Sequence, residues 1–162
     1  MEHKYFPVFM DITEKKVVVI GGGTIATRRV KTLTEFCNRI TVVSPCITEE
    51  LGELLKDGKI TWVNKMYQEL DLLDADIVIA ATDQPEVNGM IKKDCLKREK
   101  EAGKTILFNA IDAKENCDFY FPSIVQTKEV VVGINSGGSS PRQTKHVRTQ
   151  IEKALDCNSI YE

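Results

Sequence analysis

The sequence predicts an α/β protein in which helices cover both faces of a parallel β-sheet. Short runs of β-branched and other apolar residues recur along the chain, and stretches with helical spacing of apolar residues separate them. The first of these runs ends at a glycine triplet, Gly21–Gly23. Strands that alternate with helices in this order form parallel sheets with right-handed crossovers.

The predicted strands of the sheet are short and almost wholly apolar, as expected for strands buried on both faces. They are Val17–Ile20, Ile40–Val43, Ile60–Val63, Ile77–Ala81 and Thr105–Asn109. Between them, apolar residues at helical spacing predict helices over Thr24–Cys37, Thr48–Asp57 and Pro85–Glu101. Thr48 is the expected N-cap of its helix, and Pro85 is acceptable in a first helical turn.

The character of the sequence changes after residue 117. Closely spaced strand patterns around a polar turn at Thr127 predict a hairpin or meander. The expected elements are strands over Phe119–Phe121, Ser123–Gln126 and Glu129–Ile134, a Gly/Ser-rich loop Ser136–Pro141, and a helix over Arg142–Leu155. A small β-rich segment and a terminal helix therefore follow the sheet.

The composition is that of an ordinary globular protein, with 42% hydrophobic and 28% charged residues among 162. A formal net charge of -2 gives no overall basic field for nucleic acid, and no apolar run reaches the length of a membrane span. Five scattered cysteines without a C-x-x-C pair favour reduced thiols in the cytoplasm over disulfides or structural zinc. We therefore expect no nucleic-acid partner, no membrane association and no bound metal.

The segment Gly21–Ala26 fits the G-x-G-x-x-G/A pattern of a dinucleotide-binding turn. Such a turn needs glycine because a β-carbon would block the approach of the backbone to a pyrophosphate, which the helix N-terminus then stabilises. The pattern alone is a weak signal, but an apolar strand before it and a helix after it are the context it requires. It predicts a Rossmann-type domain whose cofactor loop includes Gly21, Gly23, Thr24 and Ile25.

The choice between NAD and NADP stays open at this stage. The second strand ends at Ser44 and lacks the acidic residue that usually holds the ribose hydroxyls of NAD. Ser44 is a candidate for that hydrogen bond, whereas a cation at Arg28, Arg29 or Arg39 would accept the 2′-phosphate of NADP. Thr82 ends the fourth strand, where open α/β sheets place ligands, and is either a cofactor contact or a simple helix-start residue.

Three further segments match a known family: Tyr5–Phe9 before the first strand, Asn109–Asp112 at the end of the fifth, and Ser136–Pro141 before the last helix. With the glycine loop, they make the chain resemble the precorrin-2 dehydrogenases that form the N-terminal module of siroheme synthases. The resemblance implies NAD-dependent oxidation of precorrin-2 to sirohydrochlorin in siroheme biosynthesis. In some family members ferrous iron is a further substrate, inserted to give siroheme.

The resemblance also implies roles for single residues. Pro45 and Cys46 correspond to the adenosine side of the cofactor site. Asp112 falls on the aspartate of the family's N-x-x-D motif, which acts in dehydrogenation. The residues assigned to substrate binding are Asn109, Ser136, Gly137 and Arg142.

A carboxylate at the mouth of the cofactor crevice suits this reaction, because precorrin-2 loses a hydride from carbon and a proton from a nearby position. Asp112 directly follows a predicted strand, where such a group belongs; without the resemblance, a turn-capping role would be equally favoured. The rival carboxylate is Asp118, whose place between Cys117 and an aromatic stretch favours a structural role. Cations such as Arg142 suit a substrate rich in carboxylates.

These observations divide the chain into residues 1–113, an NAD-binding domain, and residues 114–162, a β-rich segment for dimerisation and substrate binding with a terminal helix. Members of the family are homodimers and continue into a helical C-terminal domain, which we expect to be absent or truncated here. Two other functions stay open: an NAD-sensing regulatory module, and a tetrapyrrole-binding protein without turnover. The motifs Asn109–Asp112 and Ser136–Pro141 favour the enzyme, since a sensor does not need them.

Overall fold

The computed structural model describes residues 6–137 and 140–158, with side chains up to residue 155. The chain forms two compact units, one running from Val8 to Phe119 and the other comprising Met1–Pro7 with Tyr120–Glu162. The first unit holds the parallel sheet, and the second holds a hairpin and the terminal helix. Within the described ranges no helix is long and apolar enough to cross a bilayer.

The sheet of the first unit contains five parallel strands in the order β3-β2-β1-β4-β5, which confirms the expected α/β architecture. The strands are β1 (Lys16–Ile20), β2 (Arg39–Val43), β3 (Thr61–Val63), β4 (Ile77–Ala80) and β5 (Leu107–Ala110). The last residues of β1, β2, β4 and β5 pair with one another across the sheet. The loops that leave these four strands therefore emerge at one common edge.

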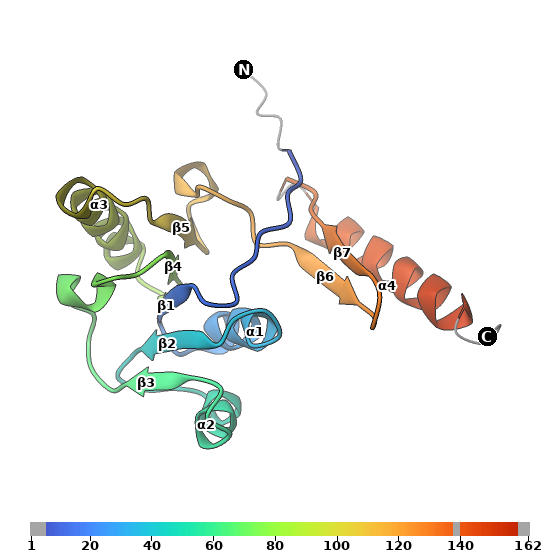
Figure 1. The fold of residues 1–162 in the computed structure, drawn as a ribbon, viewed down its shortest axis with the longest axis horizontal. Coiled ribbons are helices and arrows are strands. Elements are labelled where there is room, and N and C mark those ends of the chain that lie inside the picture. The colour runs from blue at the N-terminus through green and yellow to red at the C-terminus, as the bar shows by residue number, and fades with distance from the viewer. Residues whose placement is uncertain (1–5, 138–139, 159–162) are drawn as a thin grey trace. The chain divides into compact units, whose positions relative to one another are not determined.

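Helices cover both faces of this sheet, α1 and α2 on one side and α3 on the other (Figure 1). Their bounds are α1 (Thr24–Leu33), α2 (Glu49–Lys56) and α3 (Pro85–Ala102), with short 3-10 turns η1 (Glu69–Leu72) and η2 (Lys114–Asn116). The alternation along β1 explains the two layers. Val18 and Ile20 belong to the buried cluster that includes Ile91 of α3, whereas Val17 and Val19 point to the opposite face and are equally buried.

Helix α1 ends at Leu33, short of the expected Cys37. The N–H groups of Phe36 and Cys37 both donate to the carbonyl oxygen of Leu33 (2.9 Å), so the chain leaves the helix in a tight turn. This turn places Cys37 in the core, 3% exposed, with its thiol donating to the carbonyl oxygen of Lys15 (3.2 Å). Burial of the residues after the helix overrides their helical spacing.

The second unit contains an antiparallel hairpin of β6 (Ser123–Gln126) and β7 (Val131–Ile134), followed by α4 (Pro141–Asn158). The turn at Thr127 is confirmed, because its N–H donates to the carbonyl oxygen of Val130 (2.9 Å). The expected strand Phe119–Phe121 is wrong: the carbonyl oxygen of Phe119 accepts a hydrogen bond from the side chain of Asn109 (2.7 Å) instead of entering a ladder.

Candidate active site

Two glycines of the loop between β1 and α1 are required by close contact with neighbouring backbone. Gly21 has φ +115, in the left-handed region, and a β-carbon there would lie 2.3 Å from the carbonyl oxygen of Ala81. A β-carbon on Gly22 would lie 2.1 Å from the carbonyl oxygen of Cys46. Only glycine therefore lets this loop pass between the ends of β2 and β4. The dinucleotide pattern leaves position 22 free, so the sequence did not single out Gly22.

Gly23 differs, because no protein atom lies within 4 Å of the place where its β-carbon would be. It is the N-cap of α1, which receives no side-chain cap and has no acidic residue in its first turn. Thr24 and Ile25 are exposed beside it. The first turn of α1 thus presents N–H groups and the positive end of the helix dipole to open space. A dinucleotide pyrophosphate fits this arrangement.

The residues after β2 hold the glycine loop in place. The Thr48 N–H donates to the carbonyl oxygen of Gly22 (3.1 Å), and the Thr48 hydroxyl caps α2 as expected. Ser44 is buried, and its hydroxyl oxygen would lie 2.9 Å from a β-carbon on Gly22, so this side chain supports the loop. Pro45 and Cys46, which follow it, are exposed.

At the end of β4, Thr82 is tied to Asn88, a residue of the first turn of α3 that is only 2% exposed. The Thr82 N–H and hydroxyl donate to Oδ1 of Asn88 (3.3 and 2.7 Å), and Nδ2 of Asn88 donates back to the Thr82 carbonyl oxygen (3.1 Å). The Thr82 side chain therefore fixes the turn from β4 into α3. The sequence singled out Thr82 and missed Asn88, since a lone polar residue in a helix carries no signal of its own.

Asp112 lies at the same edge of the sheet, two residues after the end of β5. The Ile111 N–H donates to the carbonyl oxygen of Ala80 (3.1 Å), which holds this loop against the end of β4. Oδ2 of Asp112 accepts a hydrogen bond from Nδ2 of Asn88 (3.0 Å), and the residue remains exposed. Because β1, β4 and β5 end in register, the carboxylate and the glycine loop share one edge of the sheet.

Asp118 has the structural role that the sequence suggested. Its Oδ2 accepts a hydrogen bond from the Phe108 N–H (2.8 Å), and both carboxylate oxygens lie 3.0 Å from Nζ of Lys92. The Asp118 N–H in turn donates to the Phe108 carbonyl oxygen (2.9 Å). These bonds attach the residues after β5 to the sheet, which is why the first unit extends to Phe119 rather than ending at residue 113.

Asn109, assigned to substrate binding, has its side chain buried within the sheet unit (2% exposed). Its Oδ1 accepts a hydrogen bond from the guanidinium of Arg29 on α1, and its Nδ2 donates to the Phe119 carbonyl oxygen. Burial lowers the pKa of Arg29. Both ends of the Asn109 amide are therefore engaged by the protein, and the residue links β5 to α1. Its assignment to substrate binding stays a prediction.

We expect the substitution Arg29→Met to lower the free energy of unfolding by about 1–3 kcal/mol, because the buried Oδ1 of Asn109 would lose a donor. Urea unfolding followed by circular dichroism measures this change. Arg28→Met makes the same change at the neighbouring exposed position and should cost less than about 0.5 kcal/mol. Equal losses for the two variants would contradict the role given to Arg29.

The other residues assigned to the tetrapyrrole lie in the second unit: Ser136, Gly137 and Arg142. Oγ of Ser136 accepts hydrogen bonds from the Ser140 N–H (3.3 Å) and the Thr144 hydroxyl (2.9 Å), and Gly137 adopts a left-handed φ of +62. Both residues thus shape the turn into α4, at whose start Arg142 is exposed. Three residues of the expected motifs lie outside the described part of the chain: Tyr5, Gly138 and Ser139.

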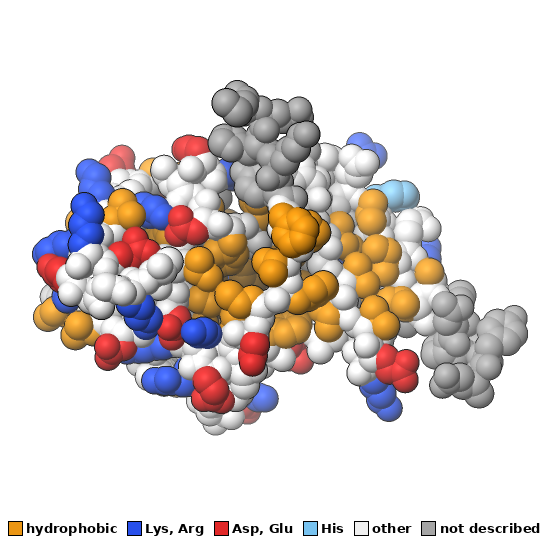
Figure 2. Space-filling view, turned by 45° about the horizontal axis from the view of Figure 1, so that its top comes forward, with side chains coloured by type: hydrophobic (Ala, Val, Ile, Leu, Met, Phe, Trp, Pro, Cys, Tyr) orange, Lys and Arg blue, Asp and Glu red, His pale blue; other side chains and the backbone are white. Residues whose placement is uncertain are grey.

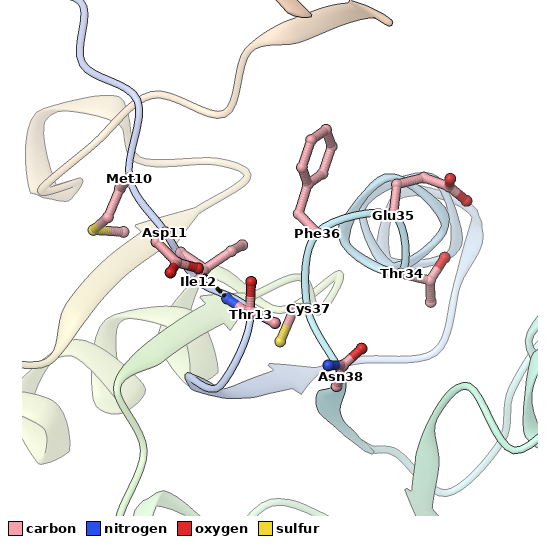
Figure 3. Close-up of a pocket in the computed structure, with 9 residues that line it drawn as sticks. All are labelled: Met10, Asp11, Ile12, Thr13, Thr34, Glu35, Phe36, Cys37 and Asn38. Atoms are coloured by element: carbon pink, nitrogen blue, oxygen red, sulfur yellow. Dashed lines mark hydrogen bonds between the residues drawn. The ribbon is translucent and has the colours of Figure 1, made fainter. Parts of the chain in front are cut away.

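A pocket of ≈ 280 Å³ lies at the other edge of the sheet, between the segment before β1 and the turn after α1 (Figure 3). It is lined by residues 10–13 and 34–38, including the buried Cys37, whose pKa is raised by burial. These residues precede β1 and β2 in the chain, so they lie at the amino ends of both strands. The pocket is therefore separate from the glycine loop.

The strand order and the open glycine loop define a Rossmann-type dinucleotide-binding protein. The family described as "Putative NAD(P)-binding" matches residues 8–123, and the chain belongs to this family.

The chain is similar to proteins of siroheme biosynthesis, in agreement with the resemblance inferred from its motifs. It is 40% identical over 149 residues to the "Probable multifunctional siroheme biosynthesis protein HemA" of Ruminiclostridium josui, which covers 91% of this chain and 28% of that protein. It is 37% identical over 149 residues to the siroheme synthase of Methylobacillus flagellatus, covering 92% of this chain and 31% of that protein. The chain thus spans less than a third of the length of these relatives.

The solved structure of "SirC, precorrin-2 dehydrogenase" resembles this fold over most of its length. The TM-score is 0.78 at 27% sequence identity, and the match covers 93% of this chain and 70% of that one. The likeness extends over both compact units, since no single unit accounts for so large a share of the chain.

Proposed function

We propose that this chain catalyses the NAD-dependent oxidation of precorrin-2 to sirohydrochlorin. The observation that carries the proposal is the exposed carboxylate of Asp112 at the same sheet edge as an uncapped, glycine-lined helix N-terminus. The likeness to a precorrin-2 dehydrogenase over 93% of the chain supports the same reaction. A nucleotide sensor needs no acid at this edge.

The cofactor is held chiefly by main-chain groups. The N–H groups of the first turn of α1, beside Gly23, bind the pyrophosphate, and the exposed residues Pro45 and Cys46 border the adenosine half. Gly21 and Gly22 act indirectly, by letting the loop pack against β4 and β2. A bound nicotinamide supplies the hydride acceptor of the reaction.

Asp112 takes the proton that the macrocycle loses when a hydride leaves its carbon. The electron pair of the broken C–H bond departs with the hydride, so the carboxylate needs only to accept a proton, as a general base does. Its exposure leaves the second oxygen accessible to a substrate while Asn88 holds the first. In the second unit, the cation of Arg142 and the hydroxyl of Ser136 suit carboxylates of the substrate. Gly137, whose N–H donates to Oδ1 of Asn135 (2.9 Å), shapes the turn beside them.

We propose NAD rather than NADP as the preferred nucleotide. Of the three candidate arginines, Arg39 begins β2 at the amino edge of the sheet and Arg29 is bonded to Asn109. The remaining candidate for a 2′-phosphate is Arg28, which is exposed on α1. The segment after β2 carries no cation before Lys56, whereas the first turn of α2 carries Glu49 and also Glu50, which is paired with Lys31. Negative charge there disfavours an additional phosphate.

The expected result is a rate with NAD at least about 10-fold higher than with NADP at equal, subsaturating concentrations, a difference of about 1.4 kcal/mol. Initial rates of precorrin-2 oxidation with each nucleotide measure it. Equal rates would contradict the preference for NAD, but they would not contradict the proposed dinucleotide site.

The test of the proposed function is an assay of the purified chain with precorrin-2 and NAD. Growth of the reduced-nicotinamide absorbance together with formation of sirohydrochlorin supports it. Binding of both molecules without turnover would overturn it in favour of a tetrapyrrole-binding protein, and NAD binding without tetrapyrrole binding in favour of a sensor.

Insertion of ferrous iron into sirohydrochlorin is a second reaction that the same assay detects, by the spectral change on adding iron. Iron entry displaces the two pyrrole N–H protons, and the exposed carboxylate of Asp112 can accept them one at a time, passing the first to water before it takes the second. Among the described residues, no three His, Cys, Asp or Glu side chains are grouped to hold a metal ion.

We further propose a cytoplasmic homodimer. Hydrophobic side chains are exposed on the face drawn in Figure 2, and the segment before β1 contributes Val8, Phe9 and Met10, which are 76%, 76% and 51% exposed. Such side chains favour a protein partner, here a second copy. Sedimentation equilibrium should give about twice the 18.2 kDa of the chain; the mass of one chain would contradict the dimer.

A further inference from the structure

The amide of Asn88 is a buried polar group at the junction of three loops. It lies in the first turn of α3, is 2% exposed, and makes hydrogen bonds with the end of β4 and with the loop after β5. A buried amide without partners would destabilise the fold, so its bonds account for its presence. The direction of each hydrogen bond, from donor to acceptor, shows that the Asn88 amide also orients its neighbours.

The hydrogen-bonding partners of the Asn88 amide allow only one assignment of its oxygen and nitrogen. The Thr82 N–H can only donate, so it must face the amide oxygen (3.3 Å). The Thr82 carbonyl oxygen can only accept a hydrogen bond, and so can an ionised Asp112 carboxylate. Both must therefore face the amide nitrogen, which lies 3.1 Å from the carbonyl oxygen and 3.0 Å from the carboxylate. The NH2 group therefore always points at Asp112.

This amide also connects the carboxylate to the cofactor loop. Thr82 directly follows Ala81, whose carbonyl oxygen sets the closest approach of Gly21. The path from the glycine loop through the end of β4 and Asn88 to the exposed Asp112 consists of close backbone contacts and hydrogen bonds. Movement of the carboxylate relative to the cofactor loop would break one of these contacts.

We propose that Asn88 is a positioning residue for the dehydrogenation: its NH2 group holds the orientation of the Asp112 carboxylate. The inference rests on the proposed function, in which Asp112 is the base. Asn88 itself touches neither substrate nor cofactor in this role. A general base displaced by about 1 Å from its productive position costs on the order of 100-fold in rate.

Other charged groups belong to the adjoining elements. They are Asp83 after β4, Glu86 and Lys92 on α3, Lys114 and Glu115 on η2, and Asp118, which is paired with Lys92. All of them are the same in the wild type and in the variants of Asn88. A difference in pH profile between those proteins therefore reports the contact of residue 88 with Asp112.

The decisive variant is Asn88→Asp, which keeps the shape of the side chain and its acceptor for Thr82 but replaces the donor to Asp112 with a second carboxylate. Two carboxylates in hydrogen-bond contact share a proton. We expect kcat near neutral pH to fall about 10–100-fold and the acidic limb of the kcat profile to move up by about one pH unit or more. The dissociation constant of NAD, measured by calorimetry, should change less than about 3-fold, because the first turn of α1 is not altered.

Asn38→Asp is the matched control, since it adds the same charge at an exposed residue of the opposite sheet edge (Figure 3) and should leave kcat and its pH profile as in the wild type. Asn88→Ser removes the amide donor by shortening the side chain, without adding charge, and should lower kcat about 10-fold with NAD affinity retained. It serves if Asn88→Asp does not fold. The double variant Asn88→Asp/Asp112→Asn restores one amide and one carboxylate across the contact. It should therefore regain most of the free energy of unfolding that Asn88→Asp loses through the contact of two carboxylates, without regaining turnover.

Wild-type kcat and pH profile in Asn88→Asp, or wild-type kcat in a folded Asn88→Ser, would overturn the positioning role. So would the same loss of NAD affinity as of kcat, because it would indicate a purely structural residue. Failure of the proposed function is seen separately, as the absence of precorrin-2 oxidation by the wild type. Unchanged turnover in Asp112→Asn with Asn88 intact would instead remove the base on which this inference rests.

Discussion

Replacing Gly23 with valine is expected to abolish NAD binding while leaving the protein folded. The backbone of Gly23 is extended (φ -83, ψ -171), which valine adopts readily, and its β-carbon would meet no protein atom within 4 Å. The side chain would instead fill the space in front of the first turn of α1. We expect the dissociation constant of NAD to rise at least about 100-fold, a loss of about 2.8 kcal/mol, and the free energy of unfolding to change by less than about 1 kcal/mol.

The matched variant Gly21→Val should behave in the opposite way. Its β-carbon would lie 2.3 Å from a backbone oxygen at φ +115, so the strain falls on the fold itself. We expect it to lower the free energy of unfolding by about 2–5 kcal/mol. Calorimetry with NAD and urea unfolding on both variants measure the contrast. Wild-type NAD affinity in Gly23→Val would show that the cofactor loop is assigned wrongly, and equal losses of stability would contradict the open space at Gly23.

Local patterns in the sequence were sufficient to predict the sheet and the tight glycine turn after its first strand. Runs such as Val17–Ile20 are short, apolar and β-branched, and only a strand buried on both faces accommodates them. Thr48 was predictable as a cap because its hydroxyl satisfies an N–H a few residues away. The same local logic failed at Phe119–Phe121, where a hydrogen bond from Asn109 takes the carbonyl that a strand would have used.

The contacts that organise the site join residues distant in sequence, and no local sequence pattern predicts them. Arg29 and Asn109 are 80 positions apart, and Asn88 and Asp112 are 24 apart. The motif around Asn109 therefore suggested a substrate contact, whereas the fold uses its amide to join β5 to α1. Gly22 escaped notice for the same reason, since its constraint comes from the carbonyl of Cys46 on the next loop.

The substitution Asp112→Asn is expected to remove most of the dehydrogenase turnover and little else. The new side chain keeps an oxygen that accepts the hydrogen bond from Asn88, so the loop after β5 keeps its position. It cannot accept a proton, and general-base catalysis contributes about 10²–10⁴-fold to a rate. We expect kcat to fall by that factor, while the dissociation constant of NAD and the free energy of unfolding stay near their wild-type values. Stopped-flow or steady-state formation of reduced nicotinamide gives kcat, and calorimetry gives the affinity.

Asp118→Asn is the control for this change, because it makes the same substitution six positions along the chain at a carboxylate engaged by Lys92 and the Phe108 N–H. Here we expect the reverse result: a loss of about 1–3 kcal/mol in the free energy of unfolding and a kcat close to wild type for the folded protein. Comparable kcat losses in the two variants would mean that neither carboxylate is the specific base. Full turnover in Asp112→Asn would remove the general base from the proposed reaction, whatever the glycine loop binds.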